Sequence, residues 1–386
     1  MTANAGNKEM KMKRREFIRL SSLTAGAALA GCAVKRGSVF VPDEKAFVSG
    51  ALIHLGSNMW TDVYTSAKPR KKGWDDKVAA DYVRAHDEVW HEVTAAMAKA
   101  KMNMVVIDLG EAVEYPSHPE LKVRGTWSVA KLRRELDRLR AMGIEPIPKV
   151  NFSTTHNAWM KDWRYKVSSP EYMQTVKDII YDVAEMFDRP RFIHIGYDEE
   201  TMGHQGGWGN YQYIVVRKRE LWWKDFLFTV QCVRDTGARA WCFSDQAWYE
   251  PDLFEKLMPK DVVQCPWNCV KSEKHPEWTT SIDKIGEMGF DVIADCATYP
   301  GSHVKPDPSG LKHTYTPIDR AKPNTQVKVM SAYCKEKIAP EHLKGFIVCP
   351  WVLTVPGIPR EVLLDSIDYA GAEFSAFAAG SGKGRS

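Results

Sequence analysis

The sequence predicts an α/β fold, a single-domain (β/α)8 TIM barrel. Eight short apolar runs alternate along the chain with longer amphipathic stretches, a pattern typical of parallel strands joined by helices. These eight units occupy about 330 residues, which is the size of one such barrel. An open, doubly wound sheet is the alternative. It is disfavoured because no G-x-G-x-x-G motif follows the first predicted strand.

The predicted strands are short runs rich in apolar and β-branched residues. Residues 104–109 are the clearest example, because five apolar residues surround a single aspartate. The eight expected strands are Ala51–Trp60, Met104–Leu109, Ile144–Val150, Phe192–Ile195, Ala240–Phe243, Val262–Cys265, Val292–Ala294 and Phe346–Val348.

The predicted helices begin and end at recognisable signals. Ser128 is placed as an N-cap, and Gly143 ends the helix that it opens. Ser169-Pro170 opens another helix, because proline fits the first helical turn, and Gly237 ends a third. The expected helices are Lys77–Lys101, Val129–Met142, Glu171–Phe187, Tyr211–Thr236, Ser281–Met288, Thr325–Lys337 and Glu361–Phe377.

Residues 1–31 have the features of an export signal. The twin-arginine pair Arg14-Arg15 is followed by the apolar run Leu20–Ala30, which is too short to cross a bilayer as a helix. The run closes on Leu-Ala-Gly-Cys, which looks like a lipobox in which Cys32 is acylated after cleavage. The alternative is an ordinary signal peptide with an incidental cysteine.

We therefore expect a bacterial lipoprotein that is exported in folded form and faces the periplasm. Ala33 stands where a retention aspartate would hold a lipoprotein at the inner membrane, which favours the outer membrane. The lipid is the one membrane anchor expected. Residues 32–48 then form a linker, residues 49–379 the catalytic barrel and residues 380–386 a disordered tail.

Charge and composition exclude some classes of partner. Residues 1–31 carry an excess of four basic side chains, which equals the formal net charge of +4 of the whole chain. The rest is close to neutral with mixed charges, which argues against a nucleic acid partner. No sequence motif indicates a cofactor or a protein partner. The cysteines form no C-x-x-C pair, and four are expected as buried free thiols: Cys242, Cys265, Cys296 and Cys349.

Polar and aromatic residues follow the predicted strands, where the active face of a barrel forms. The chain also has 14 Trp, more than average usage. Indole rings stack on the C–H faces of sugars, while carboxylates, amides and imidazoles bind hydroxyl groups, so we predict a carbohydrate site. Its candidate binding residues are Asp108, Lys149, Asn151, His156, His194, Trp248, Trp267, Tyr299 and Trp351.

Three consecutive carboxylates, Asp198, Glu199 and Glu200, come directly after the fourth predicted strand. Like charges held close together raise the pKa of one group, which provides a proton donor near neutral pH. We expect two of these three carboxylates to be functional. The structural alternative is an acidic N-terminal turn of the next helix, where the helix dipole favours negative charge.

The same segment carries a family resemblance. His194-Ile195-Gly196-Tyr197-Asp198-Glu199 resembles the H-x-G-G-D-E signature of family 20 glycoside hydrolases, the β-N-acetylhexosaminidases, with Tyr197 in place of the second glycine. Residues 148–156 resemble the strand-3 P-E-I-D-x-P-G-H more weakly, with Lys149 and Asn151 in place of both acids. Trp351 and Tyr299 are similarly placed to a pocket tryptophan and an acetamide-binding tyrosine of that family.

The resemblance implies a retaining enzyme in which the 2-acetamido oxygen of the substrate attacks the anomeric carbon. Glu199 would then be the general acid/base, and Asp198 would orient and polarise the acetamide. His156 and His194 would be supporting hydrogen-bond partners rather than metal ligands. The partner implied is a glycan, without a metal or other cofactor.

Departures from the family pattern predict an altered sugar preference and keep two alternatives open. The first strand is followed by Ser57-Asn58 and not by the arginine that the family has there, and no acid follows Trp351 at the position used in the family. Because these two family residues are missing, one alternative is a lipid-anchored glycan-binding protein without turnover. The other alternative is a metal-dependent sugar isomerase or epimerase on the same barrel. Its candidate ligands are His54, Asp108, Glu111, His156, Glu199 and His204.

Overall fold

The computed structural model describes residues 40–62, 79–208, 211–267, 276–298, 304–306, 313–323, 325–352, 354 and 360–381. Residues 42–386 form one compact unit, which contains every helix and strand described below. The predicted signal peptide, with Cys32, lies outside the described residues.

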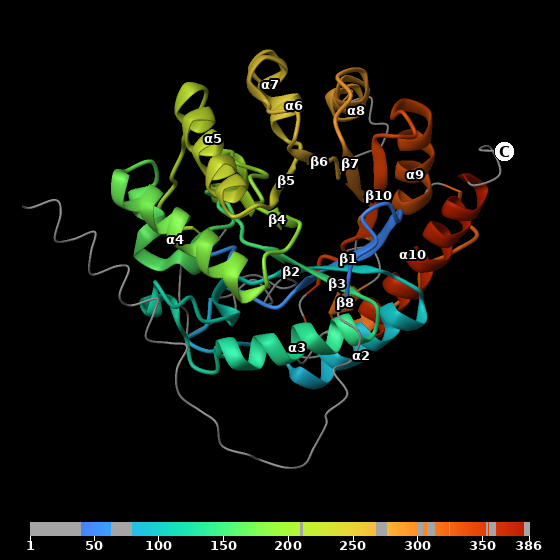
Figure 1. Ribbon diagram of the computed structural model, residues 1–386, viewed down its shortest axis with the longest axis horizontal. Coiled ribbons are helices and arrows are strands. Elements are labelled where there is room, and N and C mark those ends of the chain that lie inside the picture. The colour runs from blue at the N-terminus through green and yellow to red at the C-terminus, as the bar shows by residue number, and fades with distance from the viewer. Residues whose placement is uncertain are drawn as a thin grey trace, which may run out of the picture. The chain divides into compact units, whose positions relative to one another are not determined.

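Eight parallel strands close into a barrel in the order β1-β10-β7-β6-β5-β4-β3-β2, which confirms the predicted (β/α)8 fold (Figure 1). A short antiparallel pair, β8 (Val304–Pro306) and β9 (His313–Tyr315), lies outside the barrel sheet and was not expected. The barrel strands are β1 (Val48–His54), β2 (Met104–Asp108), β3 (Glu145–Lys149), β4 (Phe192–His194), β5 (Arg239–Phe243), β6 (Val263–Cys265), β7 (Val292–Asp295) and β10 (Leu343–Val348).

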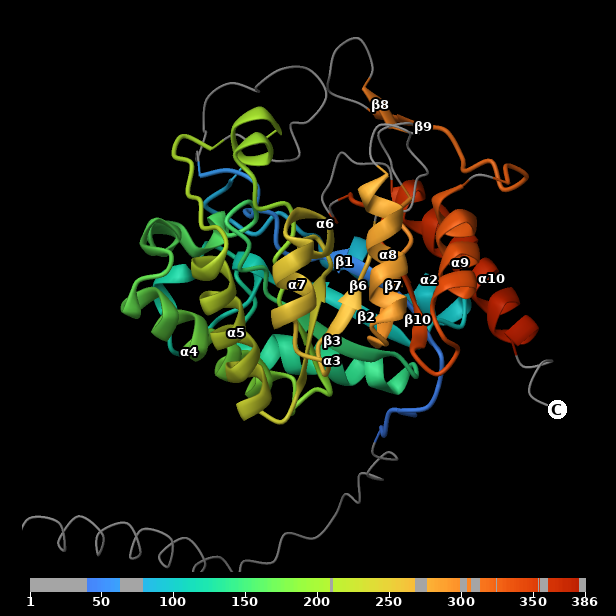
Figure 2. The same cartoon turned by 90° about the horizontal axis from the view of Figure 1, so that it is seen from above.

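Helices surround the strands, as Figure 2 shows. The α-helices are α2 (Asp87–Lys99), α3 (Val129–Ala141), α4 (Pro170–Met186), α5 (Glu220–Asp235), α6 (Gln246–Tyr249), α7 (Pro251–Leu257), α8 (Glu277–Glu287), α9 (Gln326–Lys337) and α10 (Arg360–Ser381). The predicted caps are present, because the side chains of Ser128 and Ser169 accept hydrogen bonds from backbone N–H groups two to three residues into their helices. None of the helices in the described part of the chain has both the length and the apolar character needed to span a bilayer.

Three predicted boundaries differ from the structure. The first strand starts at Val48 and ends at His54, since the N–H groups of Leu55 and Gly56 both donate to the carbonyl of Asp108 and turn the chain. Helix α2 starts only at Asp87, after the extended His86. The third difference is the start of α5, which lies at Glu220 instead of Tyr211. Helix α10 runs to Ser381, and residues 382–386 lie outside the described part.

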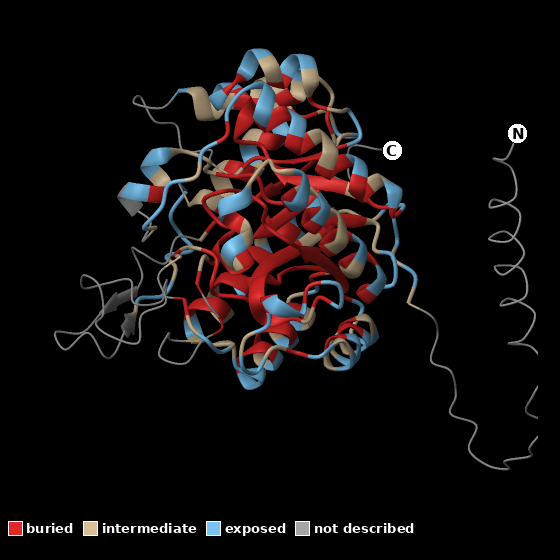
Figure 3. Ribbon diagram, turned by 90° about the vertical axis from the view of Figure 1, so that its left-hand side faces the viewer, coloured by how far each residue is buried: buried red, intermediate tan, exposed pale blue. Residues whose placement is uncertain are grey.

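The core has two layers, one inside the barrel and one between the strands and the helices (Figure 3). Because side chains alternate along a strand, every second residue faces the barrel interior. Apolar side chains such as Leu52, Val106 and Ile147 fill its lower part. At the C-terminal ends of the strands, which we call the mouth, the inward-facing residues become polar: His54, Asp108, Lys149, His194 and Asp295. The four cysteines that were expected as buried thiols are buried and form no disulfide: Cys242, Cys265, Cys296 and Cys349.

The outer layer provides a stability test at Phe346 of β10. This ring is fully buried and contacts Phe47, Phe374 and Phe377 at centroid distances of 5.6, 5.5 and 5.0 Å. We expect Phe346→Ala to lower the free energy of unfolding by about 3–5 kcal/mol, because it leaves a cavity between the barrel and α10. Denaturant unfolding measures this loss. Phe377→Ala, at a partly buried ring of the same cluster, should cost less.

Candidate active site

The segment after β4 has an unusual backbone. Gly196, Tyr197 and Glu199 all have positive φ angles, of 74°, 69° and 56°. Left-handed backbone is strained for side chains as large as tyrosine and glutamate. The Tyr197 ring offsets this strain by packing against Trp222 and Phe226 of α5, at 5.3 and 5.1 Å. The segment therefore holds a fixed turn that presents the next side chains at the mouth.

Gly196 explains why the turn lies so close to the strand-3 loop. A Cβ atom at Gly196 would lie only 1.9 Å from Oδ1 of Asn151, so no other residue fits there. That oxygen accepts hydrogen bonds from the N–H groups of Ser153 and Tyr197, at 3.0 and 3.3 Å. The amide nitrogen of Asn151 donates to Oδ1 of Asp198 at 2.9 Å. Asn151 thus joins the two loops and orients the first predicted catalytic acid.

Asp198 is buried and ionised. Burial alone would raise the pKa of its carboxyl group, but His156, the ammonium of Lys149 and the Asn151 amide together hold it well below the usual range. Nδ1 of His156 lies 3.3 Å from Oδ2 of Asp198. A carboxylate fixed in this way can accept a hydrogen bond from a substrate N–H group, or stabilise positive charge, over a wide range of pH.

Glu199 points to a more open position, since 26% of its side chain is exposed. Its backbone N–H donates to Asp245 at 2.9 Å, and its carbonyl accepts a hydrogen bond from the Thr155 hydroxyl at 2.6 Å. The two carboxylate oxygens face His156 and His204, at 3.5 and 3.6 Å. The geometry therefore combines an accessible acid with imidazole partners on both of its oxygens.

Asp245 connects the acidic turn to two of the predicted tryptophans. It accepts the indole N–H of Trp267 at 2.7 Å, and the Trp267 ring lies edge-on to Trp248 at 5.9 Å. Burial, together with the nearby charge of Asp198, raises the pKa of the Asp245 carboxyl group far above its ordinary value. Its two oxygens accept hydrogen bonds from the Glu199 backbone N–H and the Trp267 indole N–H, so Asp245 positions the acidic turn and this indole relative to each other.

The floor of the mouth contains a buried ion pair between Lys149 and Asp108. Nδ1 of His54 lies 3.2 Å from the same Asp108 carboxylate. Burial opposes the ionisation of Asp108, but Lys149 and His54 outweigh it and lower its pKa to about 2. Burial and the Lys149 charge lower the pKa of His194 to about 3, so this imidazole is neutral, and its Nδ1 accepts the N–H of Gly196 at 3.2 Å.

Two other acids near the mouth have structural roles. Glu111 accepts the backbone N–H groups of Ser57 and Asn58 at 2.8 and 3.1 Å, and so fixes the loop after β1. Glu200 is paired with the buried Arg217 at 2.8 Å. The acidic run lies well before α5, which begins at residue 220, and directly precedes a short helical segment, residues 202–208. The structural alternative, an acidic N-terminus of the next helix, therefore stays open beside the catalytic interpretation.

The predicted site residues fall into three groups. Asp198, Glu199, Asn151 and His156 form one connected cluster at the mouth. Lys149, Asp108 and His194 lie beneath it, and the Trp351 ring, on a backbone with φ 53°, is 5.9 Å from His54. Trp248 and Trp267 form the side next to Asp245, whereas Tyr299 lies outside the described residues.

Sequence reasoning missed Arg217. Its guanidinium binds Glu200 and Asp225 and donates to the carbonyl of Phe152 at 2.8 Å, which ties the acidic turn to α5 and to the strand-3 loop. No local pattern marks this residue, because its partners come from three separate segments. It holds the position of the turn rather than facing the substrate.

His156, Asp198 and Glu199 also offer ligand atoms that all lie within 4.8 Å of one another, which a divalent cation could use. Of the other candidate metal ligands, Glu111 is occupied by backbone N–H groups and the His54–Asp108 pair is shared with Lys149. Of the six predicted metal ligands, His156 and Glu199 thus belong to the cluster, together with Asp198, which was not predicted as a ligand, and His204 lies 3.6 Å from Glu199.

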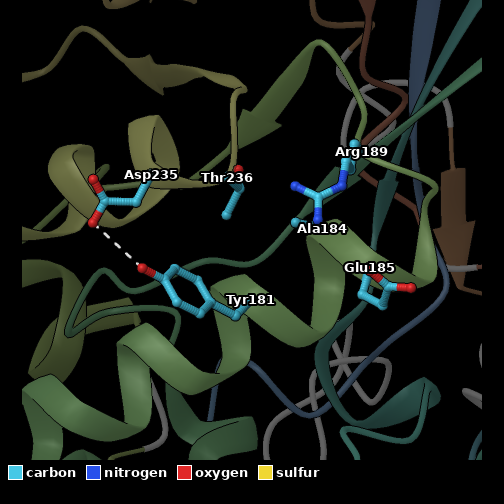
Figure 4. A pocket seen from close by; sticks show the side chains of 6 residues that line it. All are labelled: Tyr181, Ala184, Glu185, Arg189, Asp235 and Thr236. Atoms are coloured by element: carbon cyan, nitrogen blue, oxygen red, sulfur yellow. Dashed lines mark hydrogen bonds between the residues drawn. The ribbon is translucent and has the colours of Figure 1, made fainter. Parts of the chain in front are cut away.

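A separate hollow lies at the C-terminal ends of α4 and α5 (Figure 4). Because these helices run antiparallel to the strands, their C-terminal ends lie at the end of the barrel opposite the mouth. The hollow is therefore distinct from the acidic cluster at the mouth. The Tyr181 hydroxyl donates to Asp235 across this hollow at 3.3 Å. Its lining residues are Tyr181, Ala184, Glu185, Arg189, Asp235 and Thr236.

The contact of Gly196 with Asn151 can be tested by adding one methyl group. We expect Gly196→Ala to lower the free energy of unfolding by roughly 3 kcal/mol or more, because backbone strain and a steric clash add together. Gly143→Ala is the matched control: its φ is 77° and a Cβ there meets nothing within 4 Å, so only about 1–2 kcal/mol of strain applies. Equal losses in the two variants would contradict the close packing.

The buried Lys149–Asp108 pair predicts a pH dependence of stability. The pKa of Asp108 is lower in the folded protein than its ordinary 3.8. The ionised Asp108 carboxylate therefore adds about 2 kcal/mol to the free energy of unfolding above about pH 4, and this stabilisation is lost as the pH falls toward 2. The difference in unfolding free energy between wild type and Asp108→Asn should shrink by that amount from pH 5 to pH 2. A difference that is constant with pH would show that Asp108 is not preferentially ionised in the fold.

No protein-family model and no curated protein sequence matches the chain. Its fold is similar to that of several solved structures, among them structures described as GH20 enzymes. A GH20 exo-β-N-acetylglucosaminidase from Vibrio harveyi in complex with N-acetylglucosamine matches with 14% identity and a TM-score of 0.51, over 87% of this chain and 58% of that one. The GH20 β-N-acetylhexosaminidase from Streptomyces coelicolor matches with 13% identity and a TM-score of 0.54, over 86% and 69%. Dispersin B matches with 10% identity and a TM-score of 0.54, over 85% and 98%. The chain spans less than two thirds of the Vibrio protein, and at these identities the likeness establishes the barrel fold.

Proposed function

We propose that the chain is a glycoside hydrolase, a retaining β-N-acetylhexosaminidase-like enzyme assisted by its substrate. The observation that carries the proposal is the pair of adjacent acids after β4, one buried and ionised and the other accessible. Asp198 has a lowered pKa and a fixed position, while 26% of the Glu199 side chain is exposed beside it. The likeness in fold to structures described as GH20 enzymes supports the same assignment.

The proposed chemistry has two steps. Glu199 donates its proton to the glycosidic oxygen while the 2-acetamido oxygen of the substrate attacks the anomeric carbon, and Asp198 accepts the acetamide N–H. Water then attacks the anomeric carbon and gives a proton back to the Glu199 carboxylate, which restores the acid. The acetamide is released unchanged, so protons balance over the cycle.

The substituted positions of the family motif fit this scheme. Asn151 replaces an acid but still donates a hydrogen bond to Asp198. Lys149 also replaces an acid and pairs with Asp108, so it supplies positive charge beneath Asp198. We propose that Lys149 and Asn151 change which sugar hydroxyl groups are bound beneath Asp198, while Asp198 and Glu199 keep their catalytic roles.

Two other functions remain as alternatives with their own signatures. A glycan-binding protein without turnover would bind sugars and hydrolyse none. A metal-dependent isomerase or epimerase would use His156, Asp198 and Glu199 as ligands, an arrangement favoured by their mutual separations of up to 4.8 Å. Such an enzyme would purify with bound metal and lose its activity to a chelator, whereas the proposed hydrolase would keep its activity.

We also propose that the barrel works on the periplasmic side of the outer membrane, held by a lipid on Cys32. The support is the twin-arginine pair and the lipobox-like sequence within residues 1–32. Replacing Cys32 by serine should release the protein from the membrane fraction, and labelling with a radioactive fatty acid would detect the lipid directly.

The proposed roles are tested with aryl glycosides and the soluble chain that begins after Cys32. The panel includes the β-N-acetylglucosaminide and the corresponding glucoside. Turnover of the N-acetylhexosaminide should fall by roughly 10²–10⁴-fold in Glu199→Gln and by about 10²–10³-fold in Asp198→Asn. Glu220→Gln, the same change at an exposed residue of α5, is the control and should match wild type.

Other outcomes of this experiment separate the alternatives. Hydrolysis restricted to a glycoside without an acetamide would keep the hydrolase and discard substrate assistance. Full activity in Glu199→Gln would contradict the assignment of the acid. Binding of sugars without hydrolysis of any substrate would favour the binding protein.

A further inference from the structure

The two oxygens of Glu199 have different imidazole partners. Nε2 of His156, from the loop after β3, lies 3.5 Å from Oε2, and Nε2 of His204 lies 3.6 Å from Oε1. Only 8% of the His156 side chain is exposed, and its other nitrogen faces Asp198. His204 is 30% exposed and belongs to the same loop as Glu199. The two histidines therefore differ in burial and in the second group that each contacts.

His204 is held in a defined orientation. The Thr201 hydroxyl oxygen accepts the backbone N–H of His204 at 3.1 Å and lies 2.7 Å from Nδ1 of the same residue. Donation of the Thr201 hydroxyl proton to Nδ1 leaves the N–H on Nε2, toward Glu199. His204 also opens a π-helical turn, residues 204–208, a rare geometry that is frequent at functional sites.

The turn that carries His204 is anchored to its surroundings. The side chain of the buried Gln205 donates to the carbonyl of Val215 at 2.8 Å and accepts the N–H of Val215 at 2.9 Å. Nε2 of Gln205, the atom that donates to Val215, also lies 3.2 Å from the Thr154 hydroxyl oxygen. These bonds fix residues 204–205 against the strand-3 loop, so His204 faces Glu199 from a supported position.

We propose that His204 is a positioning residue for proton donation by Glu199. It donates its Nε2–H to Oε1 of Glu199 and stabilises the carboxylate that forms when the Glu199 proton moves to the glycosidic oxygen. This inference rests on the proposed function. The separation of 3.6 Å exceeds a hydrogen bond, and such contacts commonly shorten when substrate binds.

The other ionisable groups near Glu199 cannot replace this interaction. His156 is shared with Asp198, which is already ionised. Asp245 accepts the backbone N–H of Glu199 and does not contact its carboxylate. Tyr249 is neutral, because burial and the nearby acids raise its pKa. Among the described residues, His204 is thus the imidazole close to Glu199 that is not also paired with Asp198.

The leaving group of the substrate provides the test. An alkyl or unsubstituted phenyl leaving group needs a proton from Glu199, whereas 2,4-dinitrophenolate departs without one. We expect His204→Ala to lower kcat/KM by roughly tenfold to hundredfold for the poor leaving group and by less than about twofold for the good one. Added imidazole, which can enter the partly exposed space, should restore part of the loss.

His342→Ala is the matched control. Its side chain is 36% exposed and Nδ1 lies 3.1 Å from Asp291, but it precedes β10 at the opposite end of the barrel. It should leave both substrates unaffected. Equal losses with both leaving groups in His204→Ala, or no loss at all, would overturn the inference.

Glu199→Gln measured with the same two substrates separates this inference from the proposed function. If Glu199→Gln shows the leaving-group dependence and His204→Ala does not, only the role of His204 fails. If neither variant shows it, Glu199 is not the general acid and the proposed function fails as well. Thr201→Val should give a smaller version of the His204→Ala effect, because the hydroxyl that selects the tautomer is removed.

Discussion

The buried partners of the acids at the mouth of the barrel set the direction in which each carboxyl pKa shifts. Lys149 pairs directly with Asp108 and lowers its pKa, whereas His156, with smaller contributions from Lys149 and Asn151, lowers the pKa of Asp198. Asp245 and Asp295 are equally buried, but burial outweighs every favourable contact and raises the pKa of both. A low-dielectric site tolerates only as much negative charge as it can pair. The result is an ionised Asp198 directly beside Glu199, whereas the pKa of its buried neighbour Asp245 is shifted in the opposite direction.

The backbone around this charge is strained in the places where it presents side chains. Tyr197, Glu199 and Trp351 all have left-handed φ angles at the mouth. Such strain persists only when surrounding contacts impose it. Here the Tyr197 ring is packed against α5, and Glu200 is clamped by Arg217. The strained turn and its anchors therefore form one unit, which fixes the two acids relative to the barrel.

The fold and the location of the site could be predicted from local sequence, whereas most of its contacts could not. Buried parallel strands are apolar runs, so all eight were placed within a few residues, and strand ends identified the region of Asp198 and Glu199. The acidic run was expected to contain a raised pKa, yet the raised pKa belongs to Asp245 and that of Asp198 is lowered. The start of α5 was misplaced because residues before it serve distant loops: the Tyr211 hydroxyl donates to Met59, 152 residues earlier.

In the proposed mechanism, the acetamide of the substrate, rather than water, displaces the leaving group beside Asp198 and Glu199. Proton NMR during hydrolysis of a β-N-acetylhexosaminide follows the configuration of the first product and distinguishes these two routes. Two successive displacements at the anomeric carbon give the β-anomer first, with the α-anomer appearing only through later mutarotation. Initial formation of the α-anomer would mean a single attack by water, and would contradict the roles assigned to Asp198 and Glu199.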